Sequence, residues 1–350
     1  MLGRLYLSRG ARAEHPSSRR GFKMRLLRRL IAATVLLAGP LHVAAAAQEF
    51  PSRYITAIVP FGPGNSVDIV GRLLTARMSE LLGQQIIVEN IGGAGGSIGT
   101  TRAARSAPDG YTIVVGGTDT FAQNQSLNEK PNYHPATDFA PIVLAVIQPI
   151  VLVARKDLPV ANLRELVTYM KANQGKMQFG SSGIGGATHL ACAQITLAAG
   201  VTLAHVPYRS AAAGIQDMIS GNLDLYCPVA AGALPHIEAG AIKALAVLTD
   251  QRSPLLPELP TAGEQGMPGI QGYYWIGLFA PAGTPEPVLA RLAATANEAL
   301  ETPAIRGRMK EIGATIMPPQ QRTPAYLKKF IPDEIAKWAA IIKASGLSPK

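Results

Sequence analysis

The chain has 350 residues, and its 33 Lys and Arg against 23 Asp and Glu give a formal net charge of +10. The excess is local, because the first 47 residues hold nine of the basic and one of the acidic residues, which leaves 24 against 22 in the rest. No run of Lys and Arg interleaved with aromatic residues follows Gln48. The basic character therefore does not indicate nucleic-acid binding.

The N-terminal segment has the three parts of an export signal. Basic residues precede an apolar run at positions 30–39, and three alanines follow at positions 45–47. The apolar run, about ten residues long, is too short to cross a bilayer as a helix. We therefore expect cleavage near Ala47 and a mature protein in the periplasm. The true start could be Met24, and the twin-arginine-like residues 18–23 leave the export route open.

Strand and helix patterns alternate along the mature chain. Residues 55–59 alternate as a strand, and residues 67–82 place apolar side chains on one helical face that Gly83 closes. Further strands are expected at 85–89, 112–115, 143–154, 177–179, 203–206, 223–226 and 244–248. This order predicts an α/β fold with mostly parallel sheets flanked by helices.

The length of the mature chain predicts two lobes, because about 300 residues exceed what one hydrophobic core usually organises. The apolar passage at residues 141–154, interrupted by Pro149, is long enough to leave one lobe and enter the other. Residues 273–281 could carry the chain back.

Two cysteines, Cys192 and Cys227, lie in a compartment that permits disulfides. Both belong to apolar stretches, which favours buried free thiols over a disulfide, and the pairing stays open. Two cysteines without matching histidine spacing do not make a zinc site, so we expect no metal.

Two segments rich in glycine and hydroxyl residues lie between a predicted strand and a predicted helix. They are VPFGPGNSVD at residues 59–68 and FGSSGIGGATH at residues 179–189. Backbone N–H groups at a helix start attract a carboxylate or phosphate, although ordinary turns with N-caps remain the alternative. One segment falls in each predicted lobe, and ligands of open α/β sheets settle at the carboxyl ends of strands. We therefore predict that both segments grip one anion. Asp68 either stabilises its helix or contacts a ligand ammonium, hydroxyl or water.

A secreted serine hydrolase is the rival hypothesis, since residues 95–99 match G-x-S-x-G with Ser97 as nucleophile and four histidines follow. Against it, glycine-rich coil separates Asn90 from Gly96, whereas the hydrolase elbow places its serine directly after a strand. This segment more plausibly marks a close backbone crossing. His189 is expected near the site, and His205 in the core or at a hinge. Neither H-E-x-x-H nor G-x-x-x-x-G-K-[ST] occurs, so we expect no enzyme activity and no cofactor.

Nine ordered segments cover nearly the whole mature chain with a family pattern: IVPFGPGNSVDIVGRLL, VENIGGAGGSIG, APDGYTIVVGGT, DFAPI, FGSSGIGGATHLA, HVPYRSAAAGIQDMISGNLDL, ALPHIEAGAIKALAV, RSPLLPELPTAGEQG and GLFAPAGTP. Together they resemble the substrate-binding receptors of tripartite tricarboxylate transporters, the Bug family. The resemblance implies a periplasmic-binding-protein (Venus flytrap) fold without catalytic activity, with residues 48–150 plus 275–350 in one lobe and 151–274 in the other. It also implies a monomer that captures a small organic acid and delivers it to the transporter's membrane subunits.

The resemblance also names ligand-binding residues, which come from both glycine-rich loops and their surroundings: Phe61, Gly64, Asn65, Ser66, Asp68, Ser97, Thr118, Asp119, Ser181, Ser182, Gly183, Thr188, His189 and Tyr208. In receptors for amino-acid-like ligands the aspartate at the Asp68 position meets the ammonium group. This chain departs from the family at Asn65, at residues 185–187 and at Arg209, where lysine is common. These departures leave the ligand's identity open among dicarboxylates, aromatic acids and amino acids.

Overall fold

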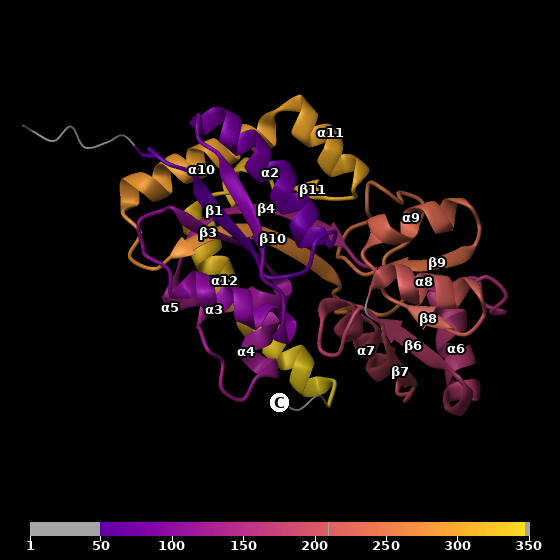
Figure 1. Ribbon diagram of the computed structural model, residues 1–350. Helices are drawn as coiled ribbons and strands as arrows, with labels where there is room; N and C mark the ends of the chain where they lie inside the picture. Colours follow the sequence, from indigo (N-terminus) through magenta and orange to yellow (C-terminus); the bar gives the residue numbers. More distant parts are fainter. Residues whose placement is uncertain (1–49, 209, 347–350) are drawn as a thin grey trace, which may run out of the picture. The chain divides into compact units, whose positions relative to one another are not determined.

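A computed structural model describes residues 50–208 and 210–346 (Figure 1). The predicted export signal and its alternative start at Met24, as well as Arg209, lie outside the described residues. Within the described part, no helix combines the length and the apolar character that spanning a bilayer requires.

The first of two sheets has six strands in the order β11-β4-β10-β3-β1-β2. Its strands are β1 (Ile55–Val59), β2 (Ile86–Asn90), β3 (Thr112–Gly117), β4 (Phe139–Pro149), β10 (Tyr273–Pro281) and β11 (Thr315–Ile316). The helices between and after them are α2 (Ser66–Leu82), α3 (Ser97–Ala104), α4 (Asn124–Leu127), α5 (Pro135–Asp138), α10 (Glu286–Glu301), α11 (Pro303–Glu311) and α12 (Pro324–Ala344), with a π-helix at Asp119–Gln123 and 3-10 turns at Ala94–Gly96 and Pro319–Gln321.

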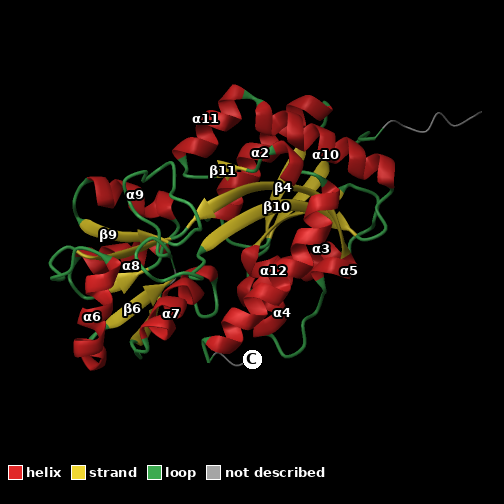
Figure 2. Ribbon diagram, turned by 180° about the vertical axis from the view of Figure 1, so that it is seen from behind, coloured by secondary structure: helices red, strands yellow, loops and turns green. Residues whose placement is uncertain are grey.

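Alternation along β1 assigns these helices to the two faces of the sheet. Ile55, Ala57 and Val59 pack in one apolar cluster with α2 and α10, whereas Ile58 packs in a second cluster with α12 and Phe121 of the π-helix. Successive strand residues point to opposite faces, so one short strand serves both clusters. Figure 2 shows α2 and α10 on one side of β4 and β10, and α3 and α12 on the other.

The second sheet has five strands in the order β7-β6-β8-β5-β9. They are β5 (Val151–Arg155), β6 (Gln178–Ser181), β7 (Ala204–Pro207), β8 (Leu225–Tyr226) and β9 (Ile242–Val247). Their helices are α6 (Leu163–Asn173), α7 (Ala187–Ala199), α8 (Ala211–Ile219) and α9 (Ala230–Glu238), with a 3-10 turn at Gln174–Lys176.

The α/β class is confirmed, but the expectation of mostly parallel sheets is corrected to mixed ones. Parallel pairing joins β1 to β2 and β3, and β6 to β7 and β8. Antiparallel pairing joins β10 to β3 and β4, β11 to β4, and β5 to β8 and β9. The reason is that the chain leaves the first sheet along β4 and returns along β10, so these two strands run in opposite directions.

The predicted strand at residues 143–154 is two strands that divide at Ile150 and belong to different sheets. There Ile150 N donates to Gly272 O over 2.9 Å, and Leu248 N donates to Ile150 O over 2.9 Å. A Cβ at Gly272 would lie 2.9 Å from Leu248 Cβ, which explains the glycine. Three segments distant in sequence thus touch where the chain passes between the sheets.

Cys192 and Cys227 form a disulfide with a Cα–Cα distance of 5.6 Å, so the preference for free thiols was wrong. Cys192 lies in α7 and Cys227 directly follows β8, and both are buried. An apolar environment suits a buried thiol and a buried bridge equally, so only the packing of α7 against β8 decided the pairing.

Candidate ligand-binding site

The first glycine-rich loop leads from β1 into α2 and is organised around Asp68. Asn65 is the N-cap of α2, and its side chain accepts from Asp68 N over 3.0 Å. The carboxylate of Asp68 accepts from Gly64 N over 2.9 Å, from Arg72 Nε over 2.9 Å and from Asn90 Nδ2 over 2.8 Å. Burial alone would raise the pKa of Asp68, but the bonds from Arg72, Gly64 and Asn90 outweigh it and hold this pKa below its ordinary value.

The backbone at the start of α2 faces no protein acceptor. The first N–H groups of a helix have no partner inside it, and within the described residues Ser66 N and Val67 N donate to no protein atom. The Ser66 hydroxyl donates to Gln148 of β4. Phe61 accepts from Asn90 Nδ2 through its carbonyl, and its ring lies against Gly96, where a Cβ would be 3.1 Å from Phe61 Cζ. The loop therefore presents two amides and a positive helix end.

The second glycine-rich loop leads from β6 into α7, and its side chains brace its own backbone. Gly183 N donates to Ser181 Oγ over 3.1 Å, and Ser182 N donates to Thr188 Oγ1 over 2.9 Å. Gly185 N donates to His189 Nδ1 over 2.9 Å. The Ser182 hydroxyl shares a 2.7 Å bond with the Tyr226 hydroxyl. Most polar side chains that the sequence assigns to ligand contact here are thus engaged in shaping the loop.

His189 and His205 stack face to face, with ring centroids 3.8 Å apart and planes 4° from parallel. Burial and the neighbouring His205 lower the pKa of His189 to about 4, and burial also lowers the pKa of His205. Both rings are therefore neutral at neutral pH, which lets His189 Nδ1 accept from Gly185. His205 Nε2 shares a 2.7 Å hydrogen bond with Ser181 Oγ. His205, which is half-buried, thus contacts a side chain of the second loop, whereas the sequence placed it in the core or at a hinge.

Asp119, the first residue of the π-helix, connects three elements. Its Oδ1 accepts from Ala187 N, the first residue of α7, over 3.4 Å, and its Oδ2 accepts from the Tyr274 hydroxyl of β10 over 3.1 Å. Burial raises the pKa of Asp119 to about 6, although the bonds from Tyr274 and Ala187 lower it. The residue as a whole is half-buried.

The side chains of two other predicted site residues bond elsewhere, although the Tyr208 backbone N donates to Ser181 O over 2.8 Å. Thr118 is fully buried, and its hydroxyl accepts from Trp275 N over 3.0 Å. The Tyr208 hydroxyl donates to Asp217 of α8 over 2.6 Å. Their polar groups are satisfied by the protein itself, so the structure gives them a supporting position.

Ser97 begins α3 and accepts from Asn124 Nδ2 over 3.2 Å. Among the described residues no histidine hydrogen-bonds to Ser97, so the partner that a hydrolase nucleophile needs does not appear there. The expected close crossing is present, since a Cβ at Gly99 would lie 2.4 Å from Ile91 O.

The described residues hold no group of three or more His, Cys, Asp or Glu that is suited to a metal ion.

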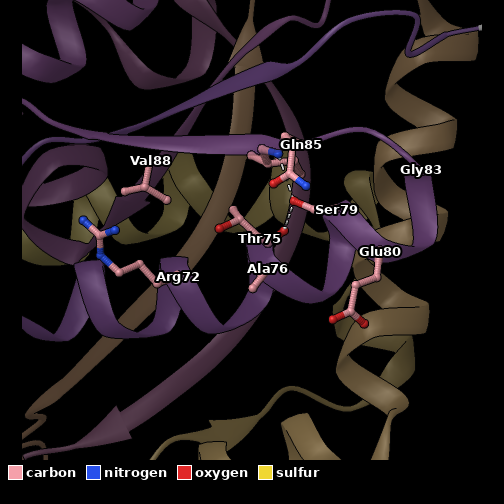
Figure 3. A pocket seen from close by; sticks show the side chains of 9 residues that line it. Arg72, Thr75, Ala76, Ser79, Glu80, Gly83, Gln85 and Val88 are labelled. Carbon is pink, nitrogen blue, oxygen red and sulfur yellow. Dashed lines mark hydrogen bonds between the residues drawn. The ribbon is translucent and has the colours of Figure 1, made fainter.

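A separate cavity of about 610 Å³ lies between α2 and β2 and contains none of the predicted ligand residues (Figure 3). Its lining includes Arg72, which connects it to the Asp68 network, and Ser79, whose hydroxyl accepts from Ile86 N over 2.8 Å.

Sequence reasoning missed Asn90, Gln148 and Tyr274, which hold Asp68, Ser66 and Asp119. Asn90 stands at the end of β2, so its place after a strand was a usable signal. Gln148 and Tyr274 belong to apolar crossing strands and left no comparable local signal.

A family model described as "Tripartite tricarboxylate transporter family receptor" matches residues 70–347. Over 294 residues the chain is 36% identical to the UPF0065 protein in the tcbD-tcbE intergenic region of Pseudomonas sp. strain P51, covering 84% of this chain and 86% of that protein.

Solved structures give the same result. The chain is similar to the periplasmic binding protein BugD, with a TM-score of 0.77, 37% identity and coverage of 86% of this chain and 100% of that one. It is similar to MatC from Rhodopseudomonas palustris with bound malate, with a TM-score of 0.76, 36% identity and coverage of 84% and 100%. It is also similar to R. palustris Rpa4515 with adipate, with a TM-score of 0.78, 32% identity and coverage of 86% and 100%.

Proposed function

Because the chain belongs to the tripartite tricarboxylate transporter receptor family, the Bug solute-binding proteins, we propose that it captures a small organic carboxylate and delivers it to the membrane subunits of such a transporter. The observation that carries this proposal is the pairing of two loops. One leads into α2 beside the first sheet, where the Ser66 and Val67 amides have no protein acceptor, and the other leads into α7 beside the second sheet, where the first amide faces Asp119. Similar structures are described with malate and with adipate.

The proposed lobes are residues 48–150 plus 275–350 and residues 151–274, a division supported by the two sheets, although β10 of the first sheet already begins at Tyr273. The ligand would lie between the lobes, and the crossing at Ile150, Leu248 and Gly272 would act as the hinge. Closure requires only that the ligand bind the closed state more tightly than the open one. The same family membership supports export to the periplasm after cleavage near Ala47.

The proposal includes no catalytic step. The hydrolase alternative needs a base next to Ser97, and the partner of that hydroxyl is the Asn124 amide, which cannot accept its proton. A carboxylate is held here by backbone N–H groups, which stabilise charge without chemistry.

The experiment is a thermal-shift screen of the purified protein against a collection of organic acids, followed by calorimetry. A ligand at about 100 times its Kd stabilises by about 2.7 kcal/mol, so the expected result is a rise in Tm of about 5 °C. Asp68→Ala should weaken binding about tenfold or more, because Gly64 N loses the acceptor that shapes the loop.

Asp109→Ala is the matched control, since it removes an exposed carboxylate paired with Arg53. If no organic acid raises Tm, carboxylate capture is wrong. An esterase turnover that Ser97→Ala abolishes would instead support the hydrolase.

A further inference from the structure

Asp68 lies in the first glycine-rich loop and Asp119 contacts the helix that follows the second, and the charges around the two carboxylates differ. Asp68 is almost fully buried and forms an ion pair with Arg72 over 2.9 Å. Gly64 N and Asn90 Nδ2 donate two further hydrogen bonds to the same carboxylate. The charge of Asp68 is therefore neutralised within α2, and the carboxylate is committed to shaping the first loop.

Asp119 receives its hydrogen bonds from neutral donors, the Tyr274 hydroxyl and the Ala187 amide. His189, the histidine of α7, has a pKa lowered to about 4 and brings no positive charge at neutral pH. As a whole residue Asp119 is half-buried, whereas Asp68 is almost fully buried. A solute that reaches the second loop would therefore meet a carboxylate whose two hydrogen-bond donors, Tyr274 and Ala187, are neutral.

The position of this charge matters for the ligand. Gly186, the N-cap of α7, has no side chain to accept from the first turn, and Asp119 of the first sheet's π-helix supplies that acceptor instead. The amide end of α7 would otherwise attract a ligand carboxylate. Here the chain's own carboxylate stands at that end, so a second ligand carboxylate would face repulsion between like charges.

We propose that Asp119 determines which chemical class of ligand the protein binds; this proposal rests on the proposed function. One end of the ligand is a carboxylate held by the Ser66 and Val67 amides, and the other end is an ammonium group that meets Asp119. The ligand is thus an amino acid or amino carboxylate, in contrast to the dicarboxylates named for the similar structures. The family resemblance assigned the ammonium contact to Asp68, whereas the hydrogen bonds of this chain favour Asp119.

The test compares pairs of probes that differ by one terminal group: adipate against 6-aminohexanoate, and succinate against 4-aminobutyrate, together with the amino acids and dicarboxylates of the organic-acid collection. Calorimetry at pH 8 is carried out on the wild type, on Asp119→Asn and on Asp157→Asn. Asparagine removes the charge and keeps one oxygen that can accept from Ala187 N, while its Nδ2 group can donate to the Tyr274 hydroxyl. Asp157→Asn removes an exposed carboxylate that pairs with Arg155 instead.

We expect the wild type and Asp157→Asn to bind the amino member of at least one pair about tenfold or more tightly than its dicarboxylate partner. In Asp119→Asn this preference should disappear or reverse. A wild-type preference for dicarboxylates, or a preference unchanged in Asp119→Asn, overturns the role of Asp119 and leaves carboxylate capture intact. Equal strengthening of both probes in Asp119→Asn also overturns it, because Asp119 would then only compete with ligands. If no member of the collection binds to any of the three proteins, both this proposal and the proposed function fail.

Discussion

Reduction of the Cys192–Cys227 disulfide is expected to lower the free energy of unfolding by about 4 kcal/mol. The two cysteines are separated by 35 positions, and the chain-entropy relation for a closed loop of that length predicts about 4 kcal/mol at 25 °C. Cys192 and Cys227 are 2% and 0% exposed, so a reductant reaches them only when the protein opens. The bond should therefore be reduced in denaturant before refolding.

The measurement is equilibrium unfolding in urea, followed by circular dichroism, with and without reductant. With a slope of about 2–3 kcal/mol per molar urea, the midpoint should fall by about 1–2 M. The Cys192→Ala/Cys227→Ala double variant should unfold at a similarly low midpoint and show no response to reductant. Equal midpoints for the oxidised and reduced wild type would refute the reasoning, as would two free thiols in the denatured protein before reduction.

Three further outcomes are expected. Glu334→Ala should lower the free energy of unfolding by about 3–5 kcal/mol. The reason is that the indole Nε1 atoms of Trp275 and Trp338 donate to Glu334 over 2.8 and 3.0 Å and would lose their acceptor. A loss below about 1 kcal/mol in urea unfolding would contradict this. Gly96→Ala should lower Tm by several degrees, since Gly96 has φ +88° and a Cβ there would lie 2.5 Å from Thr120 Cγ2, whereas Gly62→Ala, with no neighbour within 4 Å, should leave Tm unchanged. The pKa of His189 is lowered to about 4, so the stability that this neutral ring contributes is fully present above pH 6.5 and is lost as pH falls from 6.5 to about 4. That contribution is about 3 kcal/mol, and His189→Asn should lose less stability than the wild type across the same pH range in thermal unfolding.

Local patterns determined most of the secondary structure. The expected strand at residues 55–59 agrees with β1 residue by residue, and α2 begins one residue before the expected helix. The passage at residues 273–281, expected to carry the chain back, is β10. Alternation and helical periodicity report which side chains face the core, so they can be read from neighbouring residues alone. The glycine that closes α2, Gly83, has φ 68°, as a helix C-cap requires.

The tertiary structure decided which strands pair and which groups are free. The division of residues 143–154 at Ile150, the mixed sheets and the disulfide all depend on segments that meet only after folding.

The hydrogen-bond partners of Asp68 and Asp119 also differ in how far away they lie along the sequence. The partner that neutralises Asp68, Arg72, lies one helical turn away, but Asn90 is 22 positions distant. The partners of Asp119, Ala187 and Tyr274, are 68 and 155 positions distant. The residue types at both loops follow from the sequence, whereas the charge that a ligand would meet depends on hydrogen bonds between distant segments, because only folding brings their donors within reach of each carboxylate.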